Sequence, residues 1–302
     1  MKKFDFAIAY LWEYDEDFIH KLENALHEKN LSTFIISDHN IDEVIDRVNT
    51  QKIKFSFYLD RAWDVDDRYR FLGEKLREQN TKIFNNYENV LHSIDKATMH
   101  LEFITAGLNV PYSIIIPPFN EIEDISISLS DLAKLGIPFI IKPCNTTGGG
   151  LGVVTGAETL REILVERSNY GDDKYILQER IYPSLVDGKR AWFRVFWVID
   201  EPIPVWWDDN THIYSILRQD EIIRYNLEEL FNIGKKIAQV SGLDFFSTEV
   251  VLSDKSKFIA IDYVNDQCDL RIKSLHFDGV PDELIDRIIS KFRERISCRR
   301  KK

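Results

Sequence analysis

Cysteine is scarce in this chain of 302 residues, and its three copies form no pattern. Cys144, Cys268 and Cys298 are odd in number, lie far apart and lack a CxxC spacing. This arrangement argues against a disulfide framework and against a zinc site. A reducing compartment, the cytoplasm, is therefore the expected location.

Long hydrophobic runs and an excess of basic residues are also missing. No stretch approaches the roughly 20 apolar residues of a membrane span. The first apolar run is broken by Asp5 and followed by Glu13, Asp15 and Glu16, which argues against a signal sequence. The formal net charge is -11, whereas nucleic acid is bound chiefly through Lys and Arg. We therefore expect neither a membrane nor nucleic acid as a partner, and interpret the basic run 299–302 as a solvated tail.

Several motifs of hydrolases and nucleotide-binding proteins are absent as well. The sequence contains no GxSxG, no HExxH, no Cys–His signature and no Walker pattern GxxxxGK[ST]. His100 and His276 belong to no recognisable catalytic constellation. Hydrolytic chemistry is for this reason weakly supported.

The residues that are present predict a globular α/β protein. The chain is 44% hydrophobic and 29% charged, which is enough to bury a sizeable core. In the first ninety residues short apolar segments alternate with amphipathic ones, which predicts a small open α/β sheet, parallel in part. The expected strands are 4–10, 33–37, 55–59 and 81–84, and the expected helices are 16–29, 40–51 and 66–79.

The pattern changes after Asp95, which precedes a helical run ending at Gly107. A strand, a helix, a strand, a glycine-rich loop, a helix (157–168) and a strand follow up to about residue 181. Long strands, a helix, a hairpin (245–265) and a closing amphipathic helix complete the chain. We predict three parts, which are residues 1–92, 93–183 and 184–302.

The glycine-rich loop KPCNTTGGGLG follows an apolar strand that ends at Lys142. Glycines let the backbone approach phosphate oxygens closely, and a neighbouring ammonium adds charge. Alone, the loop predicts binding of some anion. A surface turn with a solvated lysine is the alternative.

Three oxygen-bearing side chains interrupt the apolar strands of the predicted hairpin. Glu249 lies within FFSTEVVL, and Asp262 and Asn265 end the next strand. Hairpin pairing places such oxygens side by side, where they suit Mg²⁺. A spacing of three puts Asp262 and Asn265 on opposite faces unless a bulge intervenes. Asp266 and Asp269 therefore stay open as alternative ligands.

Arg194 interrupts another apolar strand, where a buried cation requires an anionic partner. The partner is either a structural carboxylate or a phosphate. Arg61, Trp63 and Asp64 directly follow an expected strand, which is the usual place for ligand contacts in an open α/β sheet. A capped surface helix is the alternative for that segment.

In their order, these segments resemble the ATP-grasp superfamily over about residues 92–275. The matching segments are Asp95–Lys96, IIKP, TTGGGLGV, ILQERI, FRVFWV, STEVVL and AIDYVN. The chain is most similar to ligases related to glutathione synthase, D-alanine–D-alanine ligase and the enzyme that adds glutamate to a ribosomal protein. The resemblance implies an α/β (α+β) fold, namely an ATP-grasp fold preceded by an open α/β domain.

The resemblance also implies a role for each matching residue, with ATP as cofactor. The nucleotide phosphates are expected at Lys96, Lys142, Thr146, Thr147, Gly148, Gly149 and Gly150, and adenine at Gln178, Glu179, Arg180 and Ile181. Two Mg²⁺ ions, or Mn²⁺, are expected at Glu249, Asp262 and Asn265. The catalytic candidates are Lys142, Arg194, which would reach a phosphate, and Arg271, which would bind a substrate carboxylate.

Two positions depart from the family pattern. Trp192 stands where an acid normally holds the ribose, so Asp187 is the substitute candidate. Ser247 stands where an arginine often precedes the first metal ligand. These departures weaken the assignment to one particular ligase.

The function implied is an ATP- and Mg²⁺-dependent ligase that joins a small-molecule carboxylate to an amine or another nucleophile. The reaction would pass through an acylphosphate and release ADP and phosphate. One alternative is a kinase of the same fold acting on a polyol or inositol phosphate, which the acidic balance disfavours. The other is a nucleotide-binding protein without catalysis. A homodimer is compatible with the sequence, which identifies neither the substrates nor the oligomeric state.

Overall fold

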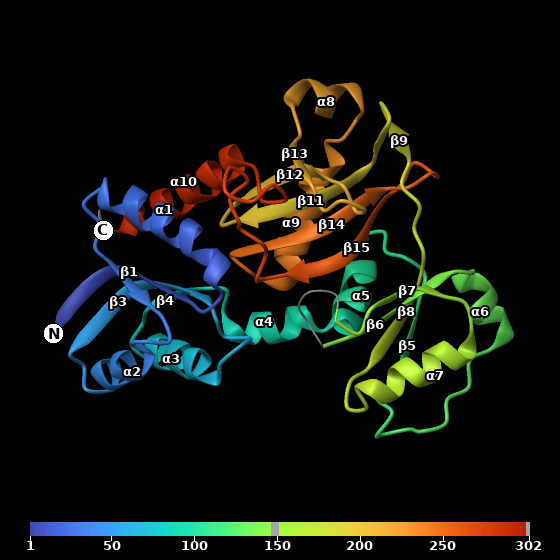
Figure 1. Ribbon diagram of the computed structural model, residues 1–302, viewed down its shortest axis with the longest axis horizontal. Helices are drawn as coiled ribbons and strands as arrows, with labels where there is room; N and C mark the ends of the chain where they lie inside the picture. The colour runs from blue at the N-terminus through green and yellow to red at the C-terminus, as the bar shows by residue number, and fades with distance from the viewer. Residues whose placement is uncertain (146–150, 300–302) are drawn as a thin grey trace.

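The computed structural model describes residues 1–145 and 151–299, so Thr146–Gly150 of the predicted loop lie outside the described residues. Three sheets of four, four and five strands and one two-stranded ribbon organise the described chain. In Figure 1 the N-terminal sheet, the sheet of β5–β8 and the sheet of β11–β15 lie around the short helices α4 and α5. Each sheet draws its strands from one of the three predicted parts, whose boundaries stay a prediction.

The N-terminal sheet has the order β2-β1-β3-β4, and all the pairings recorded in it are parallel. Its inner strand β1 carries the continuous apolar run FAIA, which is typical of a strand covered on both faces. Helices α2 and α3 pack on one face, and α1 packs on the other beside α10. The elements are β1 (Lys2–Tyr10), a 3₁₀ turn (Glu13–Asp15), α1 (Glu16–His27), β2 (Thr33–Ile36), α2 (Ile41–Asn49), β3 (Ile53–Arg61), α3 (Asp67–Glu78) and β4 (Lys82–Phe84).

Two short helices, α4 (Tyr87–Ile94) and α5 (Lys96–Thr105), connect this sheet to the next. The Asp95 carboxylate caps α5 by accepting from the N–H groups of Ala97 and Thr98. Helix α4 was not expected, because eight residues are too few to display a helical period. It runs through residue 92, where the sequence suggested a boundary.

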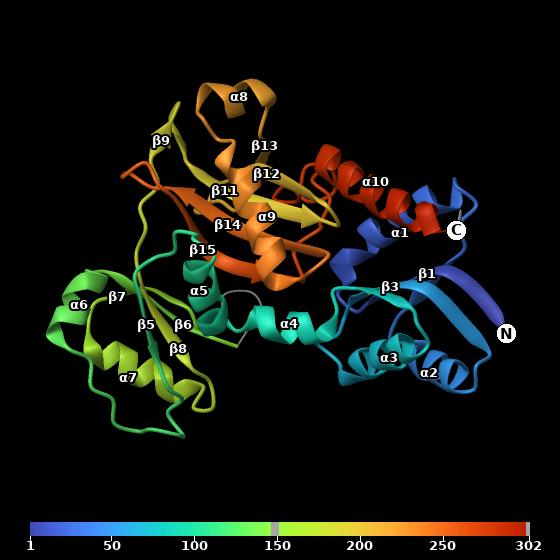
Figure 2. The same cartoon turned by 180° about the vertical axis from the view of Figure 1, so that it is seen from behind.

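The second sheet has the order β5-β8-β6-β7 with antiparallel pairing, and helices α6 and α7 flank it (Figure 2). The helix expected over 157–168 starts later, because residues 154–157 form strand β7. Thr159 and Glu162 form a capping box at its first turn. The elements are β5 (Ser113–Ile116), α6 (Leu129–Leu135), β6 (Phe139–Pro143), β7 (Val154–Ala157), α7 (Leu160–Asn169) and β8 (Tyr175–Glu179).

The third sheet is antiparallel, with the order β13-β12-β11-β14-β15. One face packs on α9, where Gly234 allows a close approach to Val195 and Pro202. The other face joins α10 and the N-terminal sheet in one core, which includes Phe196 and Phe6. The elements are β9 (Leu185–Val186), β10 (Lys189–Arg190), β11 (Trp192–Val198), β12 (Glu201–Trp207), β13 (Tyr214–Ile216), α8 (Gln219–Arg224), α9 (Glu229–Ser241), β14 (Phe245–Leu252), β15 (Phe258–Asn265) and α10 (Asp282–Arg299).

The shared core ties the beginning of the chain to its end, since α1 and α10 lie side by side in both views. Within the described part of the chain, no helix has the length and apolar character needed to cross a membrane.

Candidate active site

The two strands of the C-terminal hairpin bring the predicted metal ligands onto one face. Glu249 of β14 is directly opposite Asp262 of β15, and Ser247 is opposite Asn265. The register shifts between these two pairs, because β15 uses three steps where β14 uses two. This extra residue is the bulge that a spacing of three requires for Asp262 and Asn265 to share a face. The three side chains therefore start from the same face of the sheet.

Lys142 reaches this hairpin from the second sheet. Its Nζ donates a hydrogen bond to the carbonyl oxygen of Ile261 at 3.1 Å. Burial lowers the pKa of Lys142, and the nearby ammonium of Lys96 lowers it further, whereas Asp262 and Glu249 oppose the fall. Two cations and two carboxylates from separate parts of the fold thus share one electrostatic environment.

Lys96 is placed by the start of helix α5. Its backbone N–H donates to the carbonyl oxygen of Cys144 at 3.1 Å, two residues beyond Lys142. The helix terminus and the end of β6 are therefore joined directly. The predicted phosphate contacts at 146–150 lie outside the described residues.

Arg194 of β11 lies opposite Glu249, and the two side chains form an ion pair. The guanidinium stacks over Trp207 and Tyr214, with its Cζ 4.6 and 5.9 Å from the ring centroids. Although burial opposes its charge, Glu249 holds the pKa of Arg194 above the usual value. The buried cation thus has a carboxylate partner within the protein, while its Nε has no hydrogen-bond partner in the part of the chain that the structure describes.

Glu249 has a second donor, which the sequence did not reveal. The indole Nε1 of Trp192 donates to Glu249 Oε2 at 3.0 Å. Arg194 contacts the other oxygen, Oε1. The sequence did contain a sign of this contact: the indole N–H of Trp192 lies two residues before Arg194 on the same strand and therefore on the same face.

The expected adenine hinge is the end of strand β8. Gln178 is buried, and its Nε2 donates to the hydroxyl of Tyr263 at 2.9 Å, while Glu179 accepts from the N–H of Tyr112 at 2.8 Å. Both side chains are therefore engaged within the protein. Arg180 and Ile181 follow the strand's end, and Arg180 is exposed above the ring of Tyr182.

Tyr263 is a further residue that the sequence analysis missed. Its hydroxyl meets Gln178 Nε2 and, at 2.5 Å, the Nδ1 atom of His100. Tyr263 follows Asp262 directly and is buried in the core that includes Phe103. The sequence could have indicated this residue, because Tyr263 stands next to a predicted ligand in an apolar strand and a buried hydroxyl needs a hydrogen-bond partner.

Within the described residues, Asp187 and Arg271 pair with side chains outside the cluster of Lys96, Lys142, Glu249 and Asp262. Asp187 occupies the exposed turn of the β9–β10 ribbon at a φ of 48° and pairs with Arg224 at 3.3 Å. Figure 1 places this ribbon beside α8, away from β6. Arg271 is held by Asp269 at 2.8 Å and Asp278 at 3.0 Å, which satisfies its charge locally.

Asp266, one of the alternative ligands, is engaged with the end of β3 and the residues that follow it. Burial raises the pKa of Asp266 to about 6, and its carboxylate accepts from Trp63 Nε1 at 2.8 Å. Arg61 is buried, paired with Asp15 at 2.7 Å, and donates to the carbonyl oxygen of Cys268 at 3.0 Å. Arg61 and Trp63 therefore join the N-terminal sheet to the segment after β15, rather than forming an open surface.

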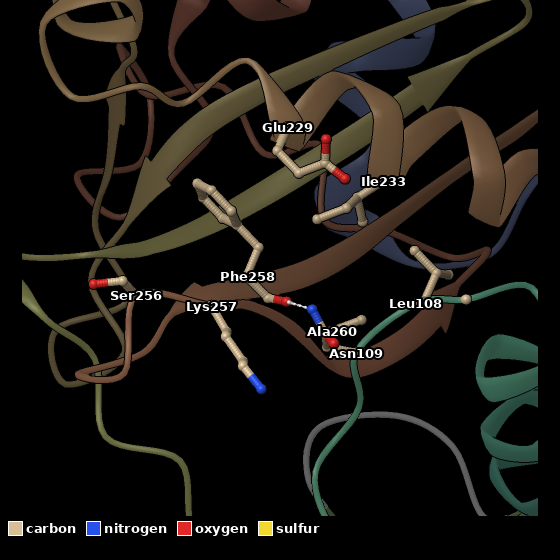
Figure 3. A pocket seen from close by; sticks show the side chains of 9 residues that line it. Leu108, Asn109, Glu229, Ile233, Ser256, Lys257, Phe258 and Ala260 are labelled. Atoms are coloured by element: carbon tan, nitrogen blue, oxygen red, sulfur yellow. Dashed lines mark hydrogen bonds between the residues drawn. The ribbon is translucent and has the colours of Figure 1, made fainter.

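A small pocket of about 220 Å³ lies elsewhere, between α9, the end of α5 and the start of β15 (Figure 3). Glu229 and Lys257 stand on its rim, and the Asn109 amide donates to the carbonyl oxygen of Phe258 at 3.0 Å. It is smaller than the roughly 300 Å³ at which ligand pockets usually begin. None of the predicted site residues lines it.

The oxygen ligands fit Mg²⁺ by their chemistry. Among residues 1–145 and 151–299, no three His, Cys, Asp or Glu side chains form a metal-binding group. A magnesium site here would depend on two carboxylates, Glu249 and Asp262, and on the amide of Asn265 for its third oxygen. Mg²⁺ ordinarily takes one or two carboxylates and completes its shell with phosphate oxygens and water.

No family model matches the sequence, and no curated protein matches it either. The ATP-grasp ligase PsnB, complexed with a minimal precursor, Mg and ADP, has a TM-score of 0.62 at 12% identity, over 95% of this chain and 98% of that one. D-alanine–D-alanine ligase from Bacillus anthracis, complexed with ATP, has a TM-score of 0.63 at 12% identity, over 98% of both chains. This chain has the ATP-grasp fold.

A RimK domain ATP-grasp protein from Sphaerobacter thermophilus is similar as well, with a TM-score of 0.64 at 14% identity over 95% of this chain and 98% of that one. The predicted ATP-grasp architecture, with its open N-terminal α/β sheet, is thereby confirmed. In the ATP-grasp fold of this chain, the candidate site lies where β6 meets the β14–β15 hairpin.

Proposed function

We propose that this chain is an ATP- and Mg²⁺-dependent ligase that joins a carboxylate to an amine and releases ADP and phosphate. The observation that carries the proposal is the convergence of Lys142 and Lys96 with Glu249 and Asp262. Cations suit nucleotide phosphates, and hard oxygen ligands suit the magnesium that accompanies them. Support comes from the similar structures, which are described as ligases complexed with ADP and Mg or with ATP.

Glu249, Asp262 and Asn265 are the residues that would hold the metal. Mg²⁺ at this place would neutralise charge on the phosphates during transfer. One or two ions are compatible with three protein oxygens, because water and phosphate complete the shells. Mn²⁺ can take the same oxygen ligands.

The side chains of the site have complementary tasks in this proposal. Lys142 and Lys96 bind the phosphates and orient the γ-phosphoryl group toward the substrate. A carboxylate oxygen of the substrate then attacks the γ-phosphorus, and the bond to ADP breaks. An amine nitrogen attacks the resulting acylphosphate carbon, a C–N bond forms, phosphate leaves, and the nitrogen loses a proton to water. Positioning and charge neutralisation suffice, so no nucleophilic side chain is needed.

In this proposal adenine binds at the end of β8, against backbone groups of Gln178, Glu179, Arg180 and Ile181. The side chains of Gln178 and Glu179 are engaged within the protein and would not take part. The loop 146–150 remains assigned to the phosphates. The side-chain partners of Asp187 and Arg271 lie outside the cluster. The role of Asp187 in ribose binding and that of Arg271 in carboxylate binding therefore rest on the sequence alone.

The proposed partners are a small-molecule carboxylate and an amine, in the cytoplasm, with a homodimer as one assembly. Purified protein should release ADP from Mg–ATP when given amino acids and candidate acids. With hydroxylamine as the amine, it should form a hydroxamate from the correct carboxylate. Phosphorylation of a polyol without any hydroxamate would instead establish the kinase.

A lysine variant tests the site directly. We expect Lys142→Met to lower ADP formation at least 100-fold, because an ammonium aimed at phosphate is worth several kcal/mol in a water-poor site. Lys257→Met, an exposed lysine in the β14–β15 turn, is the matched control and should keep native turnover. Equal turnover in both variants would remove Lys142 from the site.

A further inference from the structure

Strand β11 places two hydrogen-bond donors against one carboxylate. Trp192 and Arg194 are two residues apart and therefore lie on the same face of the sheet. Arg194 stands directly opposite Glu249 in the ladder, and Trp192 stands two pairs further along, opposite Val251. Trp192 Nε1 donates to Oε2 of Glu249 at 3.0 Å, and Arg194 Nη2 donates to Oε1. Each carboxylate oxygen thus has one donor from the same strand.

The two donors differ in what a bound cation does to them. A guanidinium is positively charged, so a divalent ion on Glu249 repels it and competes for the same oxygens. Arg194 is also held by stacking on Trp207 and Tyr214, and among the described residues its Nε has no partner and can take a further acceptor. The indole N–H of Trp192 is a neutral donor with no acceptor function. It stabilises the ionised carboxylate without opposing a metal ion.

We propose that Trp192 is a positioning residue for the metal site, whose indole N–H holds Glu249 Oε2 so that the carboxylate stays aligned with Asp262. This inference rests on the proposed function. An acid at position 192 would repel Glu249, whereas tryptophan adds a hydrogen bond to it. The ring is only half-buried, but it is carried by an inner strand paired with both β12 and β14. The sheet therefore fixes the position of the indole donor. Trp192 would keep Glu249 oriented even when a divalent ion repels the guanidinium of Arg194 from the carboxylate.

The test measures metal binding rather than turnover. Mn²⁺ is titrated into the protein in the presence of ADP, and free Mn²⁺ is followed by electron paramagnetic resonance. Trp192→Phe keeps the aromatic ring but removes the N–H, and we expect the apparent Kd for Mn²⁺ to rise about 10-fold, as is typical when a hydrogen bond to a metal ligand is lost. Trp192→His, which restores a ring donor, should recover part of the affinity. ADP binding in EDTA should not change in either variant.

The chain offers a matched control for the loss of an indole N–H. Trp206 Nε1, on strand β12 of the same sheet, donates to Glu221 Oε2 at 3.2 Å, and Glu221 is none of the proposed metal ligands. Trp206→Phe should bind Mn²⁺ as the native protein does. A tenfold loss in this control as well would overturn the proposal, since general loosening of the sheet would then explain both variants.

The remaining outcomes separate this inference from the proposed function. If the native protein binds Mn²⁺ with ADP and Trp192→Phe binds it equally well, Trp192 does not position Glu249. If both Trp192 variants lose ADP binding in EDTA too, the residue is structural and the inference fails. If the native protein binds no Mn²⁺ with ADP, the proposed function falls and this inference falls with it.

Discussion

Glu249 lies directly opposite Arg194 in the β11–β14 ladder, and the two side chains form an ion pair that is almost entirely buried. A proposed metal ligand is thus also the structural partner of a buried cation. Removing one member of a buried pair leaves the other charge uncompensated. Substitutions at Glu249 consequently change stability as well as chemistry.

Glu249→Ala is expected to lower the free energy of unfolding by about 3–5 kcal/mol, because it leaves the buried guanidinium of Arg194 without its anionic partner. Glu249→Gln keeps an oxygen acceptor and a similar shape, so its loss should be smaller. Both should abolish ADP formation. Urea denaturation of the two variants measures the difference. Equal stability losses would mean that the carboxylate charge does not matter to Arg194.

The sequence predicted much of the fold because its strands are short, apolar and separated by clear turn residues. The parallel N-terminal sheet and the C-terminal hairpin both follow from such patterns. Helix α4 did not, since eight residues give too little periodicity. The two-residue strands β9 and β10 are likewise too short to leave a pattern.

The candidate site was predictable where charge interrupts an apolar strand. Lys142, Arg194, Glu249 and Asp262 all stand out in this way, and they converge in space. Which side chains pair with one another was not predictable, because the pairing depends on the register between strands that are distant in the sequence. The bulge before Asn265 is an example, since only the observed pairing fixes on which face the amide lies.

Tyr263 gives a second prediction, on stability. Its buried hydroxyl serves Gln178 and His100 together. Tyr263→Phe should lower the free energy of unfolding by about 1–3 kcal/mol, because it leaves buried polar groups without a partner. Tyr112→Phe, which loses a hydrogen bond to the exposed Asp131, should cost no more than about 0.5 kcal/mol. Urea denaturation measures the free energy of unfolding of both variants. Equal losses would show that the buried hydrogen bonds of Tyr263 stabilise the fold no more than the hydrogen bond of Tyr112.

Asp60 predicts a pH dependence of stability. Burial raises the pKa of Asp60 from 3.8 to about 6, even though Tyr87 and the N–H of Ala62 donate to the carboxylate and limit the rise. The folded protein therefore binds this proton more tightly than the unfolded chain does. The resulting stability is fully present below about pH 4 and is lost as the pH rises through about 6.

Asp60→Asn removes this titration. A difference of about two pH units between the folded and unfolded pKa corresponds to about 3 kcal/mol. Relative to the Asn variant, the native protein should thus lose stability on that order between about pH 4 and pH 7. Urea denaturation at several pH values measures the difference. Asp254→Asn, in the exposed β14–β15 turn, should instead follow the native protein. A constant difference between native and Asp60→Asn would refute the prediction.

Arg61 and Asp15 form a fully buried pair that joins the N-terminal sheet to the segment after β15. Asp15→Leu alone should lower the free energy of unfolding by about 3–5 kcal/mol, because the buried guanidinium then keeps its charge without this carboxylate partner. The double variant Asp15→Leu with Arg61→Met should recover most of that loss, since neither charge is then left unpaired. Glu43→Gln breaks the exposed pair with Arg47 and should cost about 0.5 kcal/mol or less. If the double variant is no more stable than Asp15→Leu alone, the loss does not come from the unpaired charge of Arg61, and the prediction is wrong.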